Sequence, residues 1–255
     1  MQLIRARSAA DHHHWGSAAQ ALETARRLAP PSDAEVQLAY SEFLATTGRV
    51  REAIPYAERV RTQDPLNLGA STWLQIKYAL GGRADLADAE YERSESLEGD
   101  HQVNDFHALI RLLRRSGEPE RIDAQFKQYH SKDFNAIPLT RYLMEHWRDR
   151  ASSIAEVRRA YQAPENLNVV GLTVIAEFAD YFGDEDLALA ALRRQYVDDR
   201  AQTLMFTWAP YVTPLRADSR FKQMVRDLRL AEYYRSSGNW GDFCQPVGQA
   251  DFSCR

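Results

Sequence analysis

The chain has 255 residues, and its hydrophobic fraction of 44% and charged fraction of 27% are typical of a folded protein rather than a disordered one. Its formal net charge of −4 gives no reason to expect a nucleic acid as a direct partner. No run approaches the ~18 consecutive apolar residues of a membrane-spanning helix, and the first residues lack the apolar core of a signal peptide, so we expect a cytoplasmic protein without membrane contact.

Residues that favour helices dominate the chain. Long tracts are rich in Ala, Leu, Glu, Arg and Gln, and alternating runs of β-branched residues are nearly absent. The single strand-like run, residues 168–175, continues into Ala176-Glu177-Phe178-Ala179, and we interpret it as part of a buried helix. The sequence therefore predicts an all-α fold.

Turns recur along the chain with a period near 34 residues. Gly48, Gly82, Gly117 and Gly183 each separate two helical segments, at steps of 34, 35 and 66 residues, and the polar run 148–150 lies where a missing turn is expected. A helix often ends in a left-handed residue, a conformation that glycine adopts at least cost. The spacing predicts a series of helical hairpins.

Each predicted hairpin also has a small residue where its two helices cross, because helices approach closely only where one side chain is small. These residues stand five positions after the turns, at Ala53, Ala87, Ala155 and Ala188, with Ala18 in the same place in the first hairpin. Pro30 and Pro65 stop two of the hairpins, since proline cannot continue a helix.

Turn glycine, crossing alanine and terminal proline on this period resemble the tetratricopeptide repeat. Segments 16–25 and 48–57 match best, whereas Ile122 replaces the crossing alanine of the fourth hairpin and the fifth lacks its glycine. The resemblance implies a right-handed superhelical solenoid of about six to seven antiparallel hairpins, with a concave face lined by the first helix of each pair. We assign six hairpins to residues 1–31, 32–66, 67–101, 102–135, 136–168 and 169–200.

The period breaks near residue 200. We therefore divide the chain into a repeat solenoid, 1–200, and a C-terminal helical cap with an extended tail, 201–255. Within the tail, Phe221–Leu228 are predicted to form a helix that Asp218 or Ser219 caps, since a side-chain oxygen accepts the free N–H groups of a first turn.

The tail contains one further pattern, formed by Pro214, Leu215, Arg216, Asp218, Arg220, Phe221, Trp240, Asp242, Phe243 and Cys244. This pattern resembles the C-terminal end of bacterial tetratricopeptide proteins that carry an N-terminal effector, a winged-helix regulator or a nucleotide cyclase. The resemblance implies a sensory or interaction module. Because the chain begins with a repeat, a stand-alone protein and a fragment of a longer one both stay open, and the uncapped first helix, 1–14, favours the fragment.

Motifs for catalysis or metal binding are absent from the sequence: it has no P-loop, dinucleotide fingerprint, nucleophile elbow or H-E-x-x-H. His12, His13 and His14 are adjacent, but consecutive residues of a helix point about 100° apart, so we interpret them as an exposed helix end rather than a metal site. We expect no cofactor, no metal and no enzymatic activity. An enzyme that uses an unrecognised acid or histidine cluster is the alternative.

Cys244 and Cys254 are the only cysteines, and they lie in a tail that contains glycine and proline. They can form a disulfide if the tail folds back on itself. Two reduced thiols are expected in the cytoplasm, whereas export, for example to the periplasm behind a membrane anchor, favours the disulfide.

The fourth hairpin supplies the candidate binding site. On the repeat template, the residues on the inner side of its first helix are Asn104, His107, Arg111, Arg114 and Arg115. The first three form a stripe at i, i+3 and i+7, and arginine offers paired donors to a carboxylate or phosphate. The alternative is a solvated helix face that pairs with Glu118 or Glu120. By the same count, the inner residues of the neighbouring hairpins are Glu42, Ile76, Met144 and Glu177.

Together these features predict a protein–protein interaction scaffold or regulatory module that binds a peptide or protein segment in the concave groove, through a carboxylate or another acidic group of the partner. The alternative is the small-ligand sensor half of a bacterial signalling or transcription regulator. The sequence also leaves open a homodimer formed through the solenoid ends.

Overall fold

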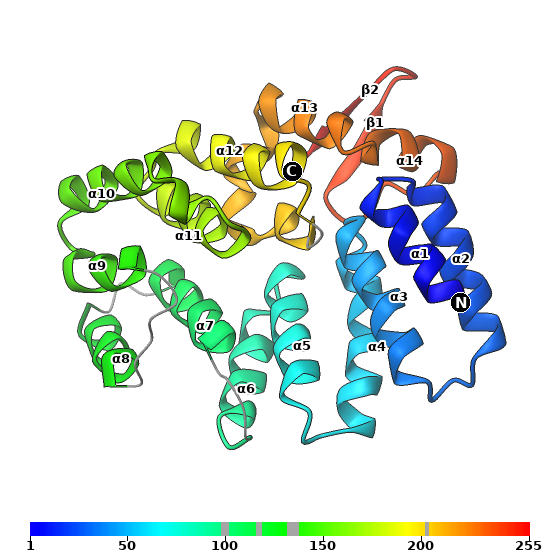
Figure 1. Ribbon diagram of the computed structural model, residues 1–255, viewed down its shortest axis with the longest axis horizontal. Coiled ribbons are helices and arrows are strands. Elements are labelled where there is room, and N and C mark those ends of the chain that lie inside the picture. Colours follow the sequence, from blue (N-terminus) through cyan, green and yellow to red (C-terminus); the bar gives the residue numbers. More distant parts are fainter. Residues whose placement is uncertain (98–101, 116–118, 132–137, 202–203) are drawn as a thin grey trace. The chain divides into compact units, whose positions relative to one another are not determined.

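The computed structural model describes all residues except 98–101, 116–118, 132–137 and 202–203. The described residues form fourteen α-helices and one two-stranded sheet, so the predicted all-α class is confirmed apart from a small C-terminal β-hairpin (Figure 1). None of these helices is long and apolar enough to cross a membrane.

The chain divides into two compact units. The first comprises residues 1–99 and 202–255, and the second comprises residues 100–201. The division into 1–200 and 201–255 separates residues with the predicted repeat from residues without it, and it stays a prediction. The two compact units are defined by contacts instead.

The first unit contains α1 (Gln2–Asp11), α2 (Trp15–Leu28), α3 (Ala34–Thr46), α4 (Val50–Gln63), α5 (Leu68–Leu80), α6 (Ala84–Ser94), α13 (Ser219–Asp227), α14 (Leu230–Ser237), β1 (Cys244–Val247) and β2 (Asp251–Cys254). The second contains α7 (Gln102–Arg115), α8 (Pro119–Ser131), α9 (Pro138–His146), α10 (Arg150–Gln162), α11 (Val169–Tyr181) and α12 (Glu185–Arg193). Consecutive members of α1–α12 pack in pairs, α1 on α2 and so on.

One turn geometry recurs between the helices of a pair. Gly48 and Gly82 are left-handed, with φ of 78° and 73°, and the next residue donates its N–H back to the preceding helix, from Arg49 to Leu44 at 2.8 Å and from Arg83 to Tyr78 at 2.7 Å. These contacts satisfy carbonyl groups that a helix end leaves open. His13, with φ of 55°, takes the glycine's place between α1 and α2, so the histidine run lies in a turn.

The predicted small residues lie at the helix crossings in four of the pairs. Ala18, Ala53, Ala87 and Ala188 are fully buried. In α10 the prediction was wrong, because Ser153 is the fully buried residue and Ala155 is exposed. The prediction from the polar run 148–150 placed the turn before α10 two residues too late in the sequence. Asp149 instead caps α10 by accepting the N–H of Ser152 at 3.1 Å.

Helix α11 confirms the interpretation of residues 168–175 as helical rather than extended. Asn168 accepts the N–H of Gly171 at 3.0 Å and so caps the helix. Residues Gly171–Ala179 are all buried, which explains why the segment is apolar on every side instead of showing a helical stripe.

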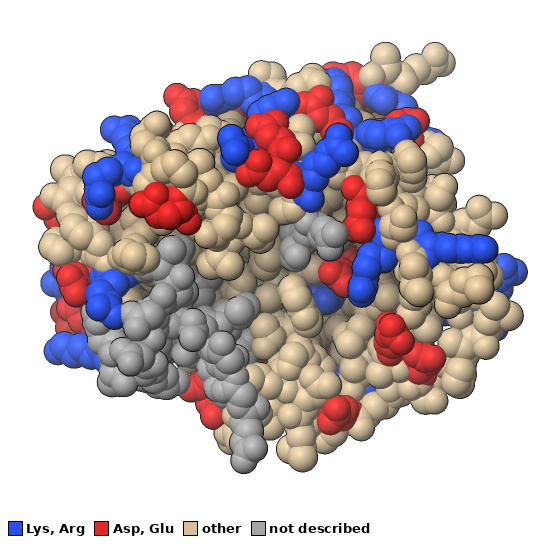
Figure 2. Space-filling view, in the orientation of Figure 1, with Lys and Arg blue, Asp and Glu red and all other residues tan. Residues whose placement is uncertain are grey.

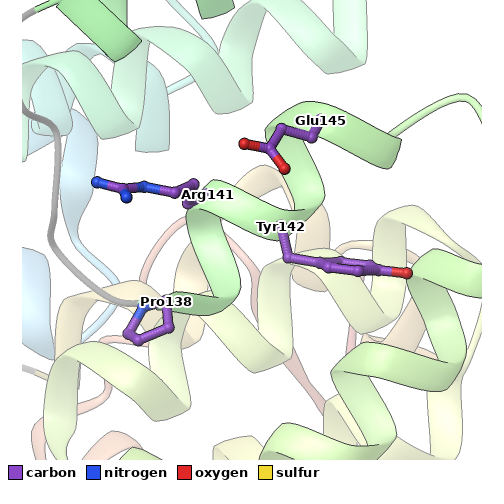
Figure 3. A pocket seen from close by; sticks show the side chains of 4 residues that line it. All are labelled: Pro138, Arg141, Tyr142 and Glu145. Atoms are coloured by element: carbon purple, nitrogen blue, oxygen red, sulfur yellow. The ribbon is translucent and has the colours of Figure 1, made fainter.

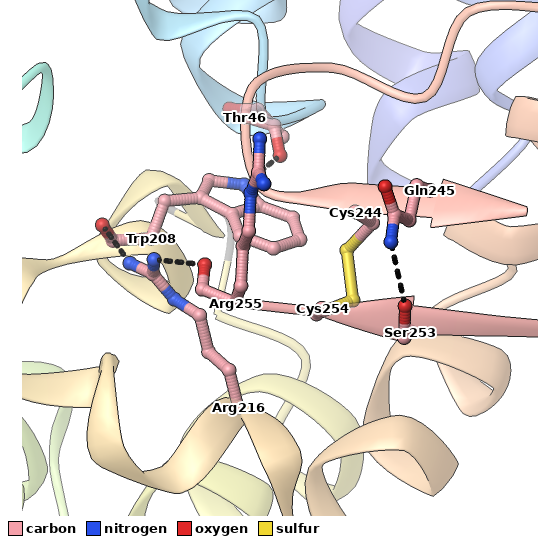
Figure 4. The surroundings of a disulfide bond; sticks show 8 residues. All are labelled: Thr46, Trp208, Arg216, Cys244, Gln245, Ser253, Cys254 and Arg255. Carbon is pink, nitrogen blue, oxygen red and sulfur yellow. Dashed lines mark hydrogen bonds between the residues drawn. A yellow bond between two sulfur atoms is a disulfide. The ribbon is translucent and has the colours of Figure 1, made fainter.

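Two residues of the tail pattern, Arg216 and Cys244, lie near Trp208 in the first unit (Figure 4). The buried Trp208 indole donates to the carbonyl of Thr46 at 2.9 Å and stacks on Phe243, with ring centroids 5.3 Å apart. Arg216, only 4% exposed, donates to the carbonyls of Trp208 at 2.7 Å and Arg255 at 2.8 Å. The predicted tail helix is confirmed as α13, with Asp218 as its cap.

Residues 244–254 of the tail form a β-hairpin that a disulfide closes. Strands β1 and β2 pair antiparallel, with Cys244 opposite Cys254, and the two sulfur atoms are bonded. The expectation of two reduced thiols is therefore corrected. The sequence could not decide this point, because it depends on the tail folding back over its glycine-containing turn.

Asp242, just before this hairpin, completes a helix far away in the sequence. Its backbone N–H donates to the carbonyl of Gly48 at 2.8 Å, and its carboxylate accepts the N–H of Arg51 at 2.9 Å. Arg51 lies in the first turn of α4, whose own N-cap residue, Arg49, provides no side-chain cap. The tail thus supplies the missing cap of α4.

We expect Asp242→Ala to lower the free energy of unfolding by ~1 kcal/mol, because the first turn of α4 loses its acceptor. Urea denaturation followed by circular dichroism measures this. Asp242→Asn keeps an acceptor oxygen and should lose less. Asp198→Ala, an exposed aspartate elsewhere, is the control; equal losses in both alanine variants would contradict the capping role.

Removing the disulfide should also destabilise the protein, because the cross-link limits the unfolded chain. We expect Cys244→Ser/Cys254→Ser to lower the free energy of unfolding by about 2–3 kcal/mol. Reduction of the wild type should reproduce this loss and leave the double variant unchanged. A wild type that is equally stable with and without reductant would show that the bond is not formed.

Candidate functional site

Three positions of the first helix in each pair define the candidate site of the second unit. In each pair we take the residue just before the second helix as the reference. The inner positions are the residues that lie 4, 7 and 11 places before this reference residue in the sequence. In α7 they are Arg114, Arg111 and His107; in α9 they are Glu145, Tyr142 and Pro138; in α11 they are Asp180, Glu177 and Thr173. Tyr142 thus replaces the predicted Met144, which is buried, because the α9–α10 turn lies two residues earlier than expected.

All five predicted groove residues belong to α7, and the structure describes the side chains of three. Those of Asn104 and Arg115 lie outside the described residues. His107 is partly buried, and burial followed by the charge of Arg111 lowers its pKa to about 3, so its ring is uncharged at neutral pH. Arg111 is 9% exposed. The stripe is therefore less open and less basic than the sequence indicated.

Arg114 connects α7 with α11. Its guanidinium donates to the carboxylate of Asp180 at 2.8 Å and to the backbone carbonyl of Glu177 at 3.3 Å. Two inner positions, separated by 66 residues of sequence, therefore meet. Arg114 thus binds a carboxylate of its own chain, and contact with a partner's acid stays a prediction.

Glu177 is a buried acid on the same face of α11. It is 2% exposed, and within the described residues its Oε2 atom has no hydrogen-bond partner. Burial raises its pKa to about 8, against the opposing effect of Arg114 and with a further increase from Asp180. Burial also raises the pKa of Asp180, although Arg114 partly offsets this. Glu177 is therefore a buried carboxylic acid that is protonated at neutral pH.

Tyr196 lies beside this acid, on a π-helical turn, Arg194–Asp198, that follows α12. Its side chain is fully buried, and its hydroxyl has no hydrogen-bond partner in the described part of the chain. Burial raises its pKa, and the Glu177 carboxylate raises it further. The neighbouring Gln195 donates to the hydroxyl of Thr173 at 2.9 Å, which fixes the π-helical turn against α11.

An open hollow lies on α9. Pro138, Arg141, Tyr142 and Glu145 line it, and its volume is about 440 Å³ (Figure 3). Arg141 and Glu145 reach out on the same side of the helix. The Tyr142 ring stacks on His146 with centroids 4.2 Å apart. All three inner positions of α9 therefore line a space that a ligand or peptide can enter.

Sequence reasoning missed this hollow because it misplaced the α9–α10 turn. The signal was present: Asp149 stands three residues before Ser152, a typical capping arrangement, and it fixes the register of α9. Tyr196 carried no comparable signal, because its approach to Glu177 depends on the π-helical turn.

Charges of both signs are interspersed over the face shown in Figure 2, and the residues drawn in colour form no large area of one sign. No group of three or more His, Cys, Asp or Glu residues in the described ranges could hold a metal ion. The chain matches none of the protein-family models with which it was compared, and no curated protein is significantly similar to it.

The buried acid predicts a pH-dependent stability. Because the pKa of Glu177 is raised from 4.5 to about 8, the folded state binds a proton that the unfolded state releases between these values. Stability should therefore fall with rising pH through this window, by roughly 1 kcal/mol per pH unit. Glu177→Gln should flatten the curve, measured by urea denaturation from pH 5 to 8, whereas Glu165→Gln, an exposed control, should keep the wild-type slope. Parallel slopes for all three proteins would contradict the burial of an ionisable Glu177.

Proposed function

We propose that this protein is a tetratricopeptide-like solenoid that acts as an interaction scaffold or regulatory module, and that it binds a peptide or protein segment on its inner face. The observation that carries the proposal is the open hollow on α9, since Pro138, Tyr142 and Glu145 are its inner positions. Recurring left-handed turns and buried small residues at the helix crossings support the repeat architecture.

Under this proposal the groove has two kinds of surface. The hollow offers an aromatic ring and two charged groups at an accessible place, which suits an extended or helical peptide. The basic stripe of α7 is the part that would meet an acidic partner group. Because Arg114 already forms an ion pair with Asp180, an acidic group of the partner has to replace Asp180 in this pair. No catalytic role is proposed.

A small-ligand sensor is the second candidate, and the size of the hollow supports it. About 440 Å³ is within the range of small-molecule pockets, although the space is open rather than enclosed. The disulfide bears on the compartment: such bonds persist in oxidising surroundings, which supports a periplasmic location over the cytoplasmic one expected from the sequence.

Site-specific photo-cross-linking tests the proposal. A photoreactive amino acid at Tyr142, in the hollow, should yield one or a few protein adducts in native lysate. The same amino acid at Ala155, exposed on α10, should yield none of them. Arg114→Glu should weaken the adducts if the partner presents an acidic group. Identical adducts from both sites would contradict the inner-face location, and a small molecule retained in native mass spectrometry without protein adducts would favour the sensor.

A further inference from the structure

Two buried polar groups of the second unit have no hydrogen-bond partner among the described residues. The Glu177 Oε2 atom and the Tyr196 hydroxyl are enclosed without a hydrogen-bond partner among the described residues. Burying a polar group without a partner costs about 1–3 kcal/mol, so nearly all such groups in folded proteins are paired. Two of them, on α11 and on the π-helical turn that packs on it, point to a group that the described residues do not provide.

The charges around the cluster show what kind of group is missing. From α7, Arg114 is the facing cation, and its guanidinium is shared between Asp180 and the backbone of Glu177. From α11, Asp180 adds a second carboxylate. The two buried residues of the π-helical turn, Gln195 and Tyr196, are neutral, whereas its charged residues, Arg194 and Asp198, are exposed. The charges that act on Glu177 are thus one guanidinium, Arg114, and one further carboxylate, Asp180. Arg114 is paired with Asp180, and Glu177 has no ion pair within the described part of the chain.

A positively charged nitrogen satisfies both acceptors at once. An ammonium or guanidinium group has several N–H donors, one for the Glu177 carboxylate and another for the phenol oxygen of Tyr196. A neutral donor would leave the acid protonated, whereas a cation stabilises its ionised form through a charge-assisted hydrogen bond. Arg114, whose side chain is 25% exposed, is the most accessible member of the cluster.

We propose that Glu177 and Tyr196 form a binding site for a cationic nitrogen, the ammonium of a lysine or the guanidinium of an arginine in the bound segment. This rests on the proposed function and specifies the partner: it presents a basic side chain to α11. Binding releases the proton of Glu177, so affinity for the basic side chain rises with pH until this acid is ionised without ligand.

Carboxyl NMR of the full chain, labelled with ¹³C at its glutamates, tests the proposal with n-butylguanidinium as the probe. The Glu177 signal is assigned by its disappearance in Glu177→Asp. Saturating probe should lower the apparent pKa of Glu177 by about 1, which corresponds to a tenfold preference for the ionised form. n-Butanol, of similar size and uncharged, should leave the titration unchanged. Tyr196→Phe should weaken probe binding severalfold, and Glu165→Gln should not.

An unchanged Glu177 titration in the presence of the probe would overturn the proposal, and so would butyrate binding at Glu177 instead. If Glu177→Asp does not fold, Tyr196→Phe still decides, because removal of one oxygen acceptor must weaken the probe. The probe experiment needs no protein partner. Protein cross-links at Tyr142 without a change in the Glu177 titration would support the scaffold and contradict the cation site. A change in the Glu177 titration without cross-links at Tyr142 would support the cation site and contradict the scaffold.

Discussion

The first unit depends on the approach of two left-handed glycines, Gly48 in the α3–α4 turn and Gly241 in the tail. A side chain on Gly241 would lie 2.7 Å from the Gly48 carbonyl oxygen, too close for any carbon atom. Without a side chain, the tail comes near enough for Asp242 to bond Gly48 and to cap α4. Trp208 closes the other side, with its ring against Gly48 and its indole N–H on Thr46. One turn therefore serves both as a helix connection and as the attachment point of the tail.

A buried arginine orders the rest of this attachment. Arg216 has backbone carbonyls as its described partners, and it lies 4.3 Å from the ring centre of Phe243. Burial without a carboxylate lowers its pKa to about 10, so it still carries its charge at neutral pH. A guanidinium can be buried in this way because its donors lie in a rigid plane that several carbonyls can share. The disulfide then keeps the two strands together next to it.

The second unit has a polar inner face, on which some buried groups have no described hydrogen-bond partner. Arg114 and Asp180 form an ion pair between helices that are distant in sequence, while the Glu177 Oε2 atom and the Tyr196 hydroxyl are buried without a hydrogen-bond partner among the described residues. Such an arrangement costs stability, and proteins commonly retain that cost where a ligand binds.

The sequence by itself determined the helical class, the positions of most turns and the small residues at the crossings. These follow from local chemistry: glycine accepts left-handed angles, alanine permits close helix approach, and aspartate or asparagine caps a first turn. Only the tertiary structure decided that Asp180 occupies Arg114, that Tyr196 meets Glu177, that Asp242 caps α4 and that the cysteines are joined. Each of these contacts joins segments that no local propensity brings together. The two-residue error in the α9–α10 turn shows how an error in a local prediction can conceal a candidate site. The conformational preference of a residue acts over about one turn of helix. The ionisation and the capping of these residues depend instead on side chains that are distant in the sequence and that only the tertiary structure brings near.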